Sequence, residues 1–245
     1  MTTNTEIERR RDDSVARAIA YSSTFIAEKA ENAEIWDVEG KRYIDFSGGI
    51  GCQNIGHRPP QVVSAIKHQL DSLTHTCFQV TPYESYIALA ERLNALYPGD
   101  FEKKSMFFSA GGEAVENAIK VARYHTKRPA LITFTNGYHG RSYMGMALSA
   151  RMVPFKQGFG PFPGEIFRLP FPDAFRGITL EDTKQAFETL FRSDCPPDQI
   201  AAIFVEPVQG EGGYNIASVS YKHIRAHETR HDIECRLLLE KKRGG

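Results

Sequence analysis

The sequence predicts an α/β protein in which helices cover a sheet. Short apolar runs of strand type alternate along the chain with amphipathic segments at helical spacing, which is typical of this class. Ala201–Val205 is a continuous apolar run of the kind buried in a parallel sheet. The chain has 245 residues, of which 41% are hydrophobic and 24% charged, so it is long enough for one large domain or two small ones.

Charge and composition exclude several function classes. The 30 basic and 30 acidic side chains cancel, which gives no support to a role on nucleic acid or on a membrane surface. No apolar run approaches the length of a membrane span, and the polar N-terminus has no signal-peptide core, so we expect a cytoplasmic protein. The cysteines are scattered without a pairing pattern and are expected to be free thiols: Cys52, Cys77, Cys195 and Cys235.

The N-terminal part contains an arm, a hairpin and two helices. Residues 1–30 are mostly polar and suggest an arm or a first helix. Apolar residues on both sides of Glu39-Gly40 predict a β-hairpin. Ser47–Gly51 is too rich in glycine for regular structure and is suited to lining a site. Helices are predicted from Pro59 or Pro60 onward and over residues 83–97.

The stretch from Ser105 to Ala122 is the centre of the prediction. Met106–Phe108 is of strand type, the chain breaks at Ser109–Gly112, and a helix follows. The amides at the start of such a helix can hold a phosphate or another anion, and adjacent glycines let the backbone approach it. The alternative is an ordinary strand-to-helix connection. The turn is neither G-x-G-x-x-G nor a Walker loop, so the sequence does not support a dinucleotide-binding site or a P-loop.

Two further loops follow predicted strands. Ala130–Phe134 is a strand that ends at Asn136-Gly137, and the strand over 201–205 ends at the loop 206–213. A loop rich in Gly, Pro and Phe is expected over 152–172, followed by a helix that begins with a capping box at Thr179. Ligands of such sheets bind beyond the carboxyl ends of the strands. The loops 109–112, 136–141 and 206–213 are therefore predicted to converge on one crevice.

These loops resemble those of class III aminotransferases, which are pyridoxal-phosphate (PLP) enzymes of fold type I. The resemblance rests on Ser109–Ala118, Gly137–Arg141 and Val205–Gly213, and it extends over residues 25–217 through Trp36–Lys41, Asp45–Ile50, Gly56-His57 and His75–Val80. It implies an N-terminal arm and small-domain segment over 1–55. It also implies the first part of a large, mixed-sheet, PLP-binding domain over 56–217.

The resemblance assigns the cofactor-binding residues. The amides of Gly111 and Gly112 would anchor the phosphate, and Tyr138 would stack on the pyridine ring, with His139 beside it as a packing or orienting residue. Many relatives carry serine where Gly112 stands, so one hydroxyl donor is missing here and a lower phosphate affinity is expected. The alternative for Tyr138 is a core aromatic after a strand.

The resemblance also assigns substrate-binding and catalytic residues. Arg141 would bind the substrate carboxylate farthest from the reacting carbon, because a guanidinium can grip a carboxylate with two hydrogen bonds. Ile50 and Gln79 would line the substrate pocket. Glu206 would lie near the ring hydroxyl of the cofactor, and Glu211 would be a switch residue that pairs with a distant arginine. The alternatives are an exposed loop arginine and solvated loop glutamates.

The implied activity is transfer of the amino group of an ω-amino acid to 2-oxoglutarate, in a homodimer that binds small molecules only. Within the class the motifs look most like those of enzymes that use 4-aminobutyrate and give succinate semialdehyde and glutamate. Acetylornithine and other ω-amino acids are alternative substrates. A non-catalytic fragment is the alternative from another class, and a nucleotide-binding module is disfavoured by the absent fingerprint.

The segment from Ser218 onward does not resemble the family and looks like translated sequencing-adapter read-through. The Schiff-base lysine, the aspartate for the pyridine nitrogen and the distant arginine of the family are not identified in it, so we expect this chain alone to be inactive. His223, His227 and His231 recur every four residues near Glu234 and Cys235, a spacing that could suggest zinc. Without a second shell to orient them, we predict no metal site.

Overall fold

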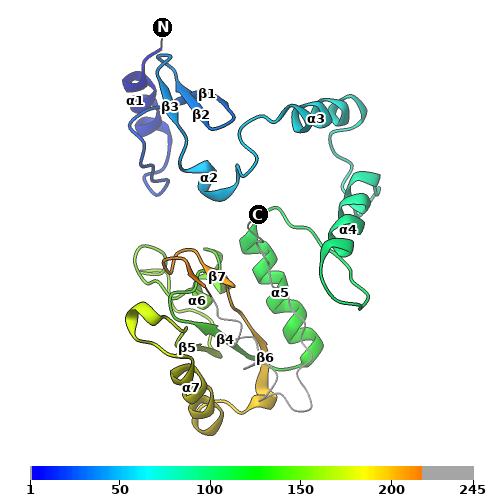
Figure 1. The fold of residues 1–245 in the computed structure, drawn as a ribbon, viewed down its shortest axis with the longest axis vertical. Helices are drawn as coiled ribbons and strands as arrows, with labels where there is room; N and C mark the ends of the chain where they lie inside the picture. The colour runs from blue at the N-terminus through cyan, green and yellow to red at the C-terminus, as the bar shows by residue number, and fades with distance from the viewer. Residues whose placement is uncertain (1, 217–245) are drawn as a thin grey trace. The chain divides into compact units, whose positions relative to one another are not determined.

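The computed structural model describes residues 2–216 (Figure 1). The chain divides into two compact units, Met1–Phe101 and Glu102–Gly245. This division follows the contacts within each unit and leaves the predicted domain boundary near residue 55 as a prediction. Each unit is described separately below.

The first unit contains an antiparallel three-stranded sheet in the order β1-β2-β3. The predicted hairpin at Glu39-Gly40 is confirmed, since β2 and β3 flank it and pair with each other. The helices predicted near residues 60 and 83–97 are confirmed as α3 and α4. The bounds are α1 Asn4–Ser14, β1 Ala27–Glu31, β2 Glu34–Asp37, β3 Arg42–Ile44, α2 Gly48–Gly51, α3 Pro60–Ser72 and α4 Glu84–Leu96.

A buried carboxylate shapes the hairpin turn. Asp37 is 1% exposed, and its side chain accepts hydrogen bonds from the amides of Glu39 and Lys41, at 3.0 and 2.9 Å, and from the hydroxyl of Tyr43 at 2.9 Å. These bonds satisfy a charge that burial would otherwise make costly. The turn is therefore held by a side chain as well as by the strand ladder.

The glycine-rich stretch Ser47–Gly51 forms a left-handed turn, although its hydrogen bonds define it as the short helix α2. Gly49 and Ile50 have positive φ angles of 59° and 55°. Asp45 fastens the turn by accepting from the amides of Ser47 and Gly48, both at 3.0 Å, and by pairing with His57 Nε2 at 2.7 Å. The Ser47 hydroxyl, His57 and the Gly48 amide lower the pKa of Asp45 to about 2.

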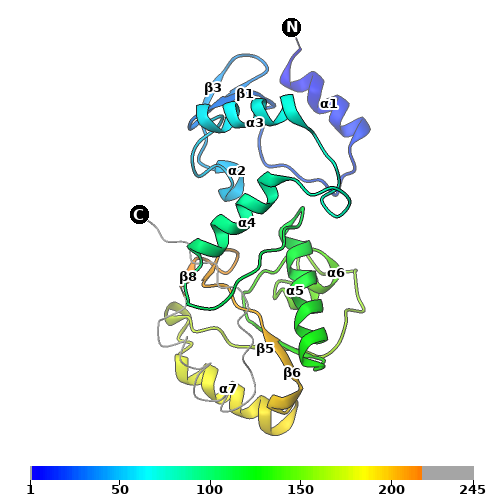
Figure 2. The ribbon, with the colours of Figure 1, turned by 90° about the vertical axis from the view of Figure 1, so that its right-hand side faces the viewer.

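The second unit is built on a parallel sheet in the order β5-β4-β6 (Figures 1 and 2). Helices α5 and α6 contribute to the core on one face, and α7 packs on the other. The bounds are α5 Gly111–Thr126, β4 Ala130–Phe134, α6 Tyr143–Leu148, β5 Ile166–Leu169, α7 Leu180–Ser193 and β6 Ile200–Ile203, followed by the short antiparallel pair β7 Val208–Gln209 and β8 Asn215–Ile216.

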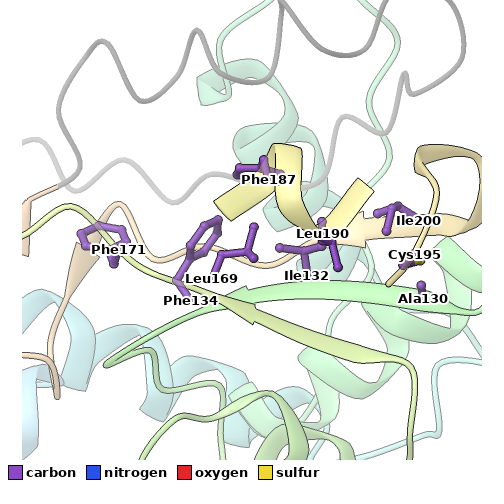
Figure 3. Close-up of a cluster of buried hydrophobic side chains, with 9 residues drawn as sticks. All are labelled: Ala130, Ile132, Phe134, Leu169, Phe171, Phe187, Leu190, Cys195 and Ile200. Carbon is purple, nitrogen blue, oxygen red and sulfur yellow. The ribbon is translucent and has the colours of Figure 1, made fainter. Parts of the chain in front are cut away.

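The core explains why the sheet is covered on both faces. Successive residues of a strand point to opposite faces, and β4 is buried along its whole length. Ile132 and Phe134 pack with Phe187 of α7 in one cluster (Figure 3). Leu131 packs with Ile119 of α5 in the other cluster. The predicted α/β class is confirmed by this two-sided arrangement.

Two predictions about strands are wrong. Met106–Phe108 is in none of the strands and sheets assigned within residues 2–216. Conversely, β5 lies inside the stretch 152–172 that was predicted to be a loop. The four residues of β5 include the charged Arg168, and Pro163-Gly164 lies shortly before them, so the local sequence does not indicate a strand. The strand forms because it pairs with β4.

The predicted capping box of α7 is present. The Thr179 hydroxyl accepts from the Asp182 amide at 3.1 Å, and the Asp182 carboxylate accepts from the Thr179 amide at 2.7 Å. We expect Thr179→Ala to lower the free energy of unfolding by about 1 kcal/mol, because it removes the acceptor of this cap. Urea denaturation measures the loss. Thr179→Ser keeps the hydroxyl and is expected to retain most of the stability; an equal loss in both variants would contradict the capping argument.

Candidate active site

The site begins at the first turn of α5. Gly111 and Gly112 are the first two residues of the helix, so their amides have no partner in a preceding turn and lie at its positive end. The N-cap residue Ala110 has no side-chain hydrogen bond to offer. A Cβ added at Gly111 would meet no atom within 4 Å, so there is open space beside this turn. This geometry suits an anion at the start of the helix.

The loop that follows β4 lies against this turn. A Cβ added at Gly140 would lie 3.2 Å from the Cα of Gly112, and Gly140 has a φ of +102°, which other residues rarely adopt. Only glycine therefore allows the two segments to approach so closely. The predicted convergence of the loops 109–112 and 136–141 is confirmed.

The third loop joins through Glu206. Its carboxylate accepts a hydrogen bond from the Tyr138 amide at 2.8 Å. Burial raises the pKa of Glu206, and the amides of Tyr138 and Gly210 oppose that rise. All three loops therefore lie together, with a partly buried carboxylate beside Tyr138.

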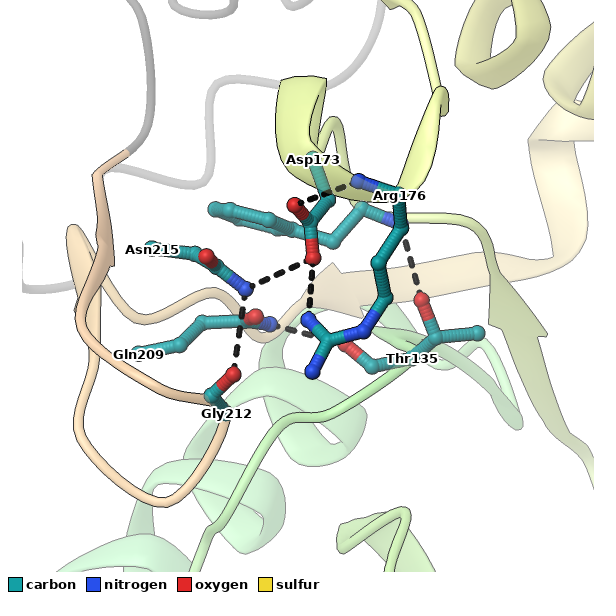
Figure 4. Close-up of polar contacts among 7 residues, drawn as sticks. Thr135, Asp173, Arg176, Gln209, Gly212 and Asn215 are labelled. Atoms are coloured by element: carbon teal, nitrogen blue, oxygen red, sulfur yellow. Dashed lines mark hydrogen bonds and ion pairs between the residues drawn. The ribbon is translucent and has the colours of Figure 1, made fainter.

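Polar contacts fasten the loop 206–213 and β8 to the segments that follow β4 and β5 (Figure 4). The buried Gln209 donates from Nε2 to the carbonyl of Thr135 at 2.8 Å. The side-chain amide of Asn215 donates to the carboxylate of Asp173 at 3.2 Å and to the carbonyl of Gly212 at 3.1 Å. Asp173 also forms an ion pair with Arg176. These bonds hold the loop that carries Glu206 and Glu211.

His139 faces the sheet. Its Nε2 lies 3.1 Å from the hydroxyl of Thr133, which itself lies 3.1 Å from the carbonyl of Leu148. Because the Thr133 hydroxyl donates its one hydrogen to Leu148, His139 must donate from Nε2. Burial, together with the nearby charge of Arg168, lowers the pKa of His139 to about 4. The ring is therefore neutral at pH 7, as a packing and orienting residue requires.

Two cations hold the C-terminal end of α6. Arg168 Nη2 donates to the carbonyls of Ala147, Leu148 and Ser149 at 3.0, 3.3 and 3.0 Å. Lys156 Nζ donates to the same Ser149 carbonyl at 3.0 Å. Cations are favourable at this end of a helix.

Ser149 connects this group to the site. Its hydroxyl accepts from the amide of His139 at 2.9 Å and lies 2.8 Å from the carbonyl of Gly145. Sequence reasoning missed Ser149, Lys156 and Arg168, because no local pattern indicates contacts between residues so far apart in the chain.

The other predicted site residues lie in both units of the chain. Arg141 is exposed at the end of the loop that contacts Gly112. The Tyr138 ring packs against Phe155, with centroids 5.3 Å apart. Glu211 forms an ion pair with Arg151 at 3.2 Å, a partner that the sequence did not indicate. Ile50 and Gln79 belong to the first unit. The roles assigned to all these residues remain predictions.

Residues 2–216 contain no group of three or more His, Cys, Asp or Glu side chains placed to hold a metal ion. The histidines at 223, 227 and 231 lie outside the described residues. Within the same range, none of the helices has both the length and the apolar character needed to cross a membrane.

Curated proteins that are similar in sequence to this chain include aminotransferases that act on ω-amino acids by name. The chain is 46% identical over 232 residues to the 5-aminovalerate aminotransferase DavT of Pseudomonas aeruginosa, covering 94% of this chain and 54% of the relative. It is 43% identical over 234 residues to the 4-aminobutyrate aminotransferase GabT of Escherichia coli, covering 95% and 55%. The chain thus spans about half the length of the curated relatives it matches.

Solved structures that resemble this chain are also aminotransferases. An (S)-enantioselective ω-transaminase from Thermomicrobium roseum superimposes with a TM-score of 0.80 at 28% identity, covering 93% of this chain and 55% of that one. The taurine:2-oxoglutarate aminotransferase of Bifidobacterium kashiwanohense, solved in complex with PLP and glutamate, gives a TM-score of 0.82 at 25% identity, covering 93% and 53%. The architecture is therefore that of fold type I aminotransferases, seen over about half of their chains.

A sequence profile of the family described as aminotransferase class-III matches residues 16–233. The matched range reaches residue 233 and includes the first part of the segment from Ser218, so it does not support the expectation that this whole segment is unrelated to the family. The segment lies outside the described residues. The match covers well over half of the sequence. This chain belongs to the class III aminotransferase family.

Proposed function

We propose that the three loops form the cofactor and substrate-carboxylate side of a PLP-dependent aminotransferase site. The proposed reaction transfers the amino group of an ω-amino acid, 4-aminobutyrate in the first instance, to 2-oxoglutarate. The observation that carries the proposal is the placement of the loop 137–141 between the first turn of α5 and Glu206. The class of the family and the names of the relatives support the same chemistry.

The residues present fit a phosphorylated cofactor. The first turn of α5 offers amides at a helix N-terminus with open space beside Gly111, and a buried hydroxyl without a partner, that of Ser142, lies next to Gly112. Gly111 and Gly112 would hold the phosphate, Tyr138 the ring, and Glu206 the side of the ring hydroxyl, with His139 behind the loop. When bound, PLP supplies the electron sink that transamination requires.

Arg141 is the proposed anchor of the substrate carboxylate. It follows the loop that contacts Gly112 and is exposed, so its guanidinium is accessible to a ligand. 5-Aminovalerate is a second candidate donor, because the relative from Pseudomonas aeruginosa carries that name. Both donors are ω-amino acids with one carboxylate, which a guanidinium binds with two parallel hydrogen bonds.

We propose that the active protein is a cytoplasmic homodimer, in which Ile50 and Gln79 line the substrate pocket and Glu211 acts as the switch residue. Within this chain Glu211 has an alternative partner in Arg151. The chain spans about half the length of its curated relatives. We therefore expect no aminotransferase activity from the 245-residue chain alone.

Arg141 provides the direct test. In a chimera of residues 1–216 with the corresponding C-terminal half of the Escherichia coli relative, we expect transfer from 4-aminobutyrate to 2-oxoglutarate. Arg141→Lys is expected to raise the KM for 4-aminobutyrate about 10-fold with a smaller change in kcat, because an ammonium cannot reproduce the bidentate contact. Arg192→Lys, on the exposed end of α7, is the matched control and should leave both constants unchanged. An unchanged KM in Arg141→Lys would refute the assignment, and a folded chimera without transfer would refute the proposed activity.

A further inference from the structure

The hydroxyl of Ser142 has an unusual environment. Its Oγ is buried and has no hydrogen-bond partner among the described residues. Ser142 is the N-cap residue of α6, where a serine side chain normally accepts from an amide of the first turn, but it makes no such bond. The Met144 amide in that turn donates instead to the Glu116 carboxylate of α5 at 2.9 Å. Glu116 thus takes over part of the capping role and leaves the Ser142 hydroxyl unused.

This unused hydroxyl lies at the start of α5. A Cβ added at Gly112 would lie 3.6 Å from Ser142 Oγ and 3.8 Å from its Cβ, so the oxygen is the nearer atom. A Cβ added at Gly145 would lie 2.9 Å from the same oxygen. The hydroxyl therefore occupies a space that glycines on both sides keep clear of other side chains.

A buried hydroxyl without a partner is unfavourable, because it has lost its hydrogen bonds to water and gained none in the protein. An anion held by the amides of Gly111 and Gly112 would provide the missing acceptor, and the positive end of α5 favours an anion at this place. Gly112 brings no side-chain donor of its own to the turn. The unpaired hydroxyl of Ser142 could therefore supply the side-chain donor that the turn lacks.

We propose that Ser142 is a further anion-binding residue of this site, whose hydroxyl donates to the phosphate held at the first turn of α5. The inference rests on the proposed function only for the identity of the anion, the PLP phosphate. Binding of a phosphate group as such tests it independently of any activity.

Calorimetry on the 245-residue chain provides the test, with inorganic phosphate, pyridoxine 5′-phosphate and pyridoxine as probes. Pyridoxine 5′-phosphate lacks an aldehyde, so it cannot react with surface lysines. Ser142→Ala is expected to weaken binding of both phosphorylated probes about 10-fold, because a hydrogen bond to a charged group is lost. Binding of pyridoxine should not change. Ser142→Thr keeps a hydroxyl and should retain the affinity, and Ser193→Ala on α7 is the matched control.

A second variant separates loss of the donor from damage to the fold. The distance of 3.6 Å between a Cβ at Gly112 and Ser142 Oγ is an ordinary contact, so the Cβ of a serine at this position fits without strain. In the Ser142→Ala background, Gly112→Ser places a new hydroxyl at the same turn and is expected to recover phosphate affinity.

The outcomes separate this inference from the proposed function. Equal affinities of the unmutated chain and Ser142→Ala, or no binding of either phosphorylated probe, would overturn the role of Ser142. An active chimera together with an unaffected Ser142→Ala would overturn only the inference. A phosphate affinity that depends on Ser142, with a folded but inactive chimera, would overturn only the aminotransferase proposal.

Discussion

Replacement of Gly145 by alanine is expected to lower the free energy of unfolding by about 2–3 kcal/mol. A Cβ at this position would lie 2.8 Å from the carbonyl oxygen of His139, 2.9 Å from Ser142 Oγ and 3.2 Å from the carbonyl carbon of Gly140. Two of these atoms are backbone, so the added methyl cannot be accommodated by a rotamer change alone. Overpacking of a buried position has a cost of this order.

The same substitution should also disturb the site, because the displaced atoms belong to the loop that contacts Gly112. We expect weaker binding of pyridoxine 5′-phosphate to Gly145→Ala than to the unmutated chain. Urea denaturation gives the stability and calorimetry gives the affinity. Gly164→Ala is the matched control: a Cβ there meets nothing within 4 Å, and its backbone is outside the left-handed region. It should change the stability by less than about 0.5 kcal/mol.

Similar stabilities of Gly145→Ala and Gly164→Ala would show that the loop 139–142 moves freely away from α6. In that case the close approach of Gly140 to Gly112 would not be a rigid feature, and the anion site would lose its support. A large loss confined to Gly145→Ala would instead show that the glycine is needed for the close packing of α6 against the loop.

The parts of the fold that the sequence predicted are those with local signals. The capping box at Thr179, the turn at Glu39-Gly40 and the apolar run at 130–134 each act within a few residues, and each prediction is confirmed. The strand β5 was missed because its formation depends on pairing with β4. Met106–Phe108 shows the reverse, since this apolar run of strand type is not among the strands assigned within residues 2–216.

In the candidate site, too, some features could be predicted from the sequence and others could not. The carboxyl ends of the parallel strands β4 and β6 meet at one edge of the sheet, which explains why the loops 136–141 and 206–213 lie together as predicted. The turn 109–112 joins them through the close approach of Gly112 and Gly140, although the run before it is not assigned as a strand. The residues that hold these loops were not predicted. Arg168 reaches three carbonyls about twenty residues away, and Arg151 meets Glu211 across a separation of 60 residues. The unused hydroxyl of Ser142 could not be predicted either, because it depends on Glu116 capping another helix.

Mild acid is expected to destabilise the second unit through His139 by about 3 kcal/mol. Burial and the charge of Arg168 lower the pKa of His139 from 6.5 to about 4 in the folded chain. Below pH 6.5 the unfolded chain binds a proton at this histidine and the folded chain does not, so stability falls as the pH falls. The loss is complete near pH 4, and a lowering of the pKa of this size corresponds to about 3 kcal/mol.

Urea denaturation between pH 7.5 and pH 4 measures this loss. His139→Gln removes the titrating ring and keeps a side-chain amide able to reach Thr133, so it should be less stable at pH 7.5 and show a flatter pH dependence. His125→Gln, at an exposed position of α5, is the matched control and should keep the pH dependence of the unmutated chain. Asp45 contributes little over this interval, because its pKa is lowered from 3.8 to about 2 on folding and its stabilisation is lost mainly below about pH 4.

The result bears on the site because of what a neutral His139 does there. Its ring donates to Thr133, and its amide donates to Ser149, which lies at the end of α6 held by Arg168 and Lys156. Protonation would add a further buried positive charge beside Arg168, and the loop that carries Tyr138 and Gly140 would have to open to solvate it. We therefore expect phosphate binding to weaken over the same pH interval in the unmutated chain. Equal pH dependence in the unmutated chain and His139→Gln would contradict this account and show that His139 is solvated in the folded state.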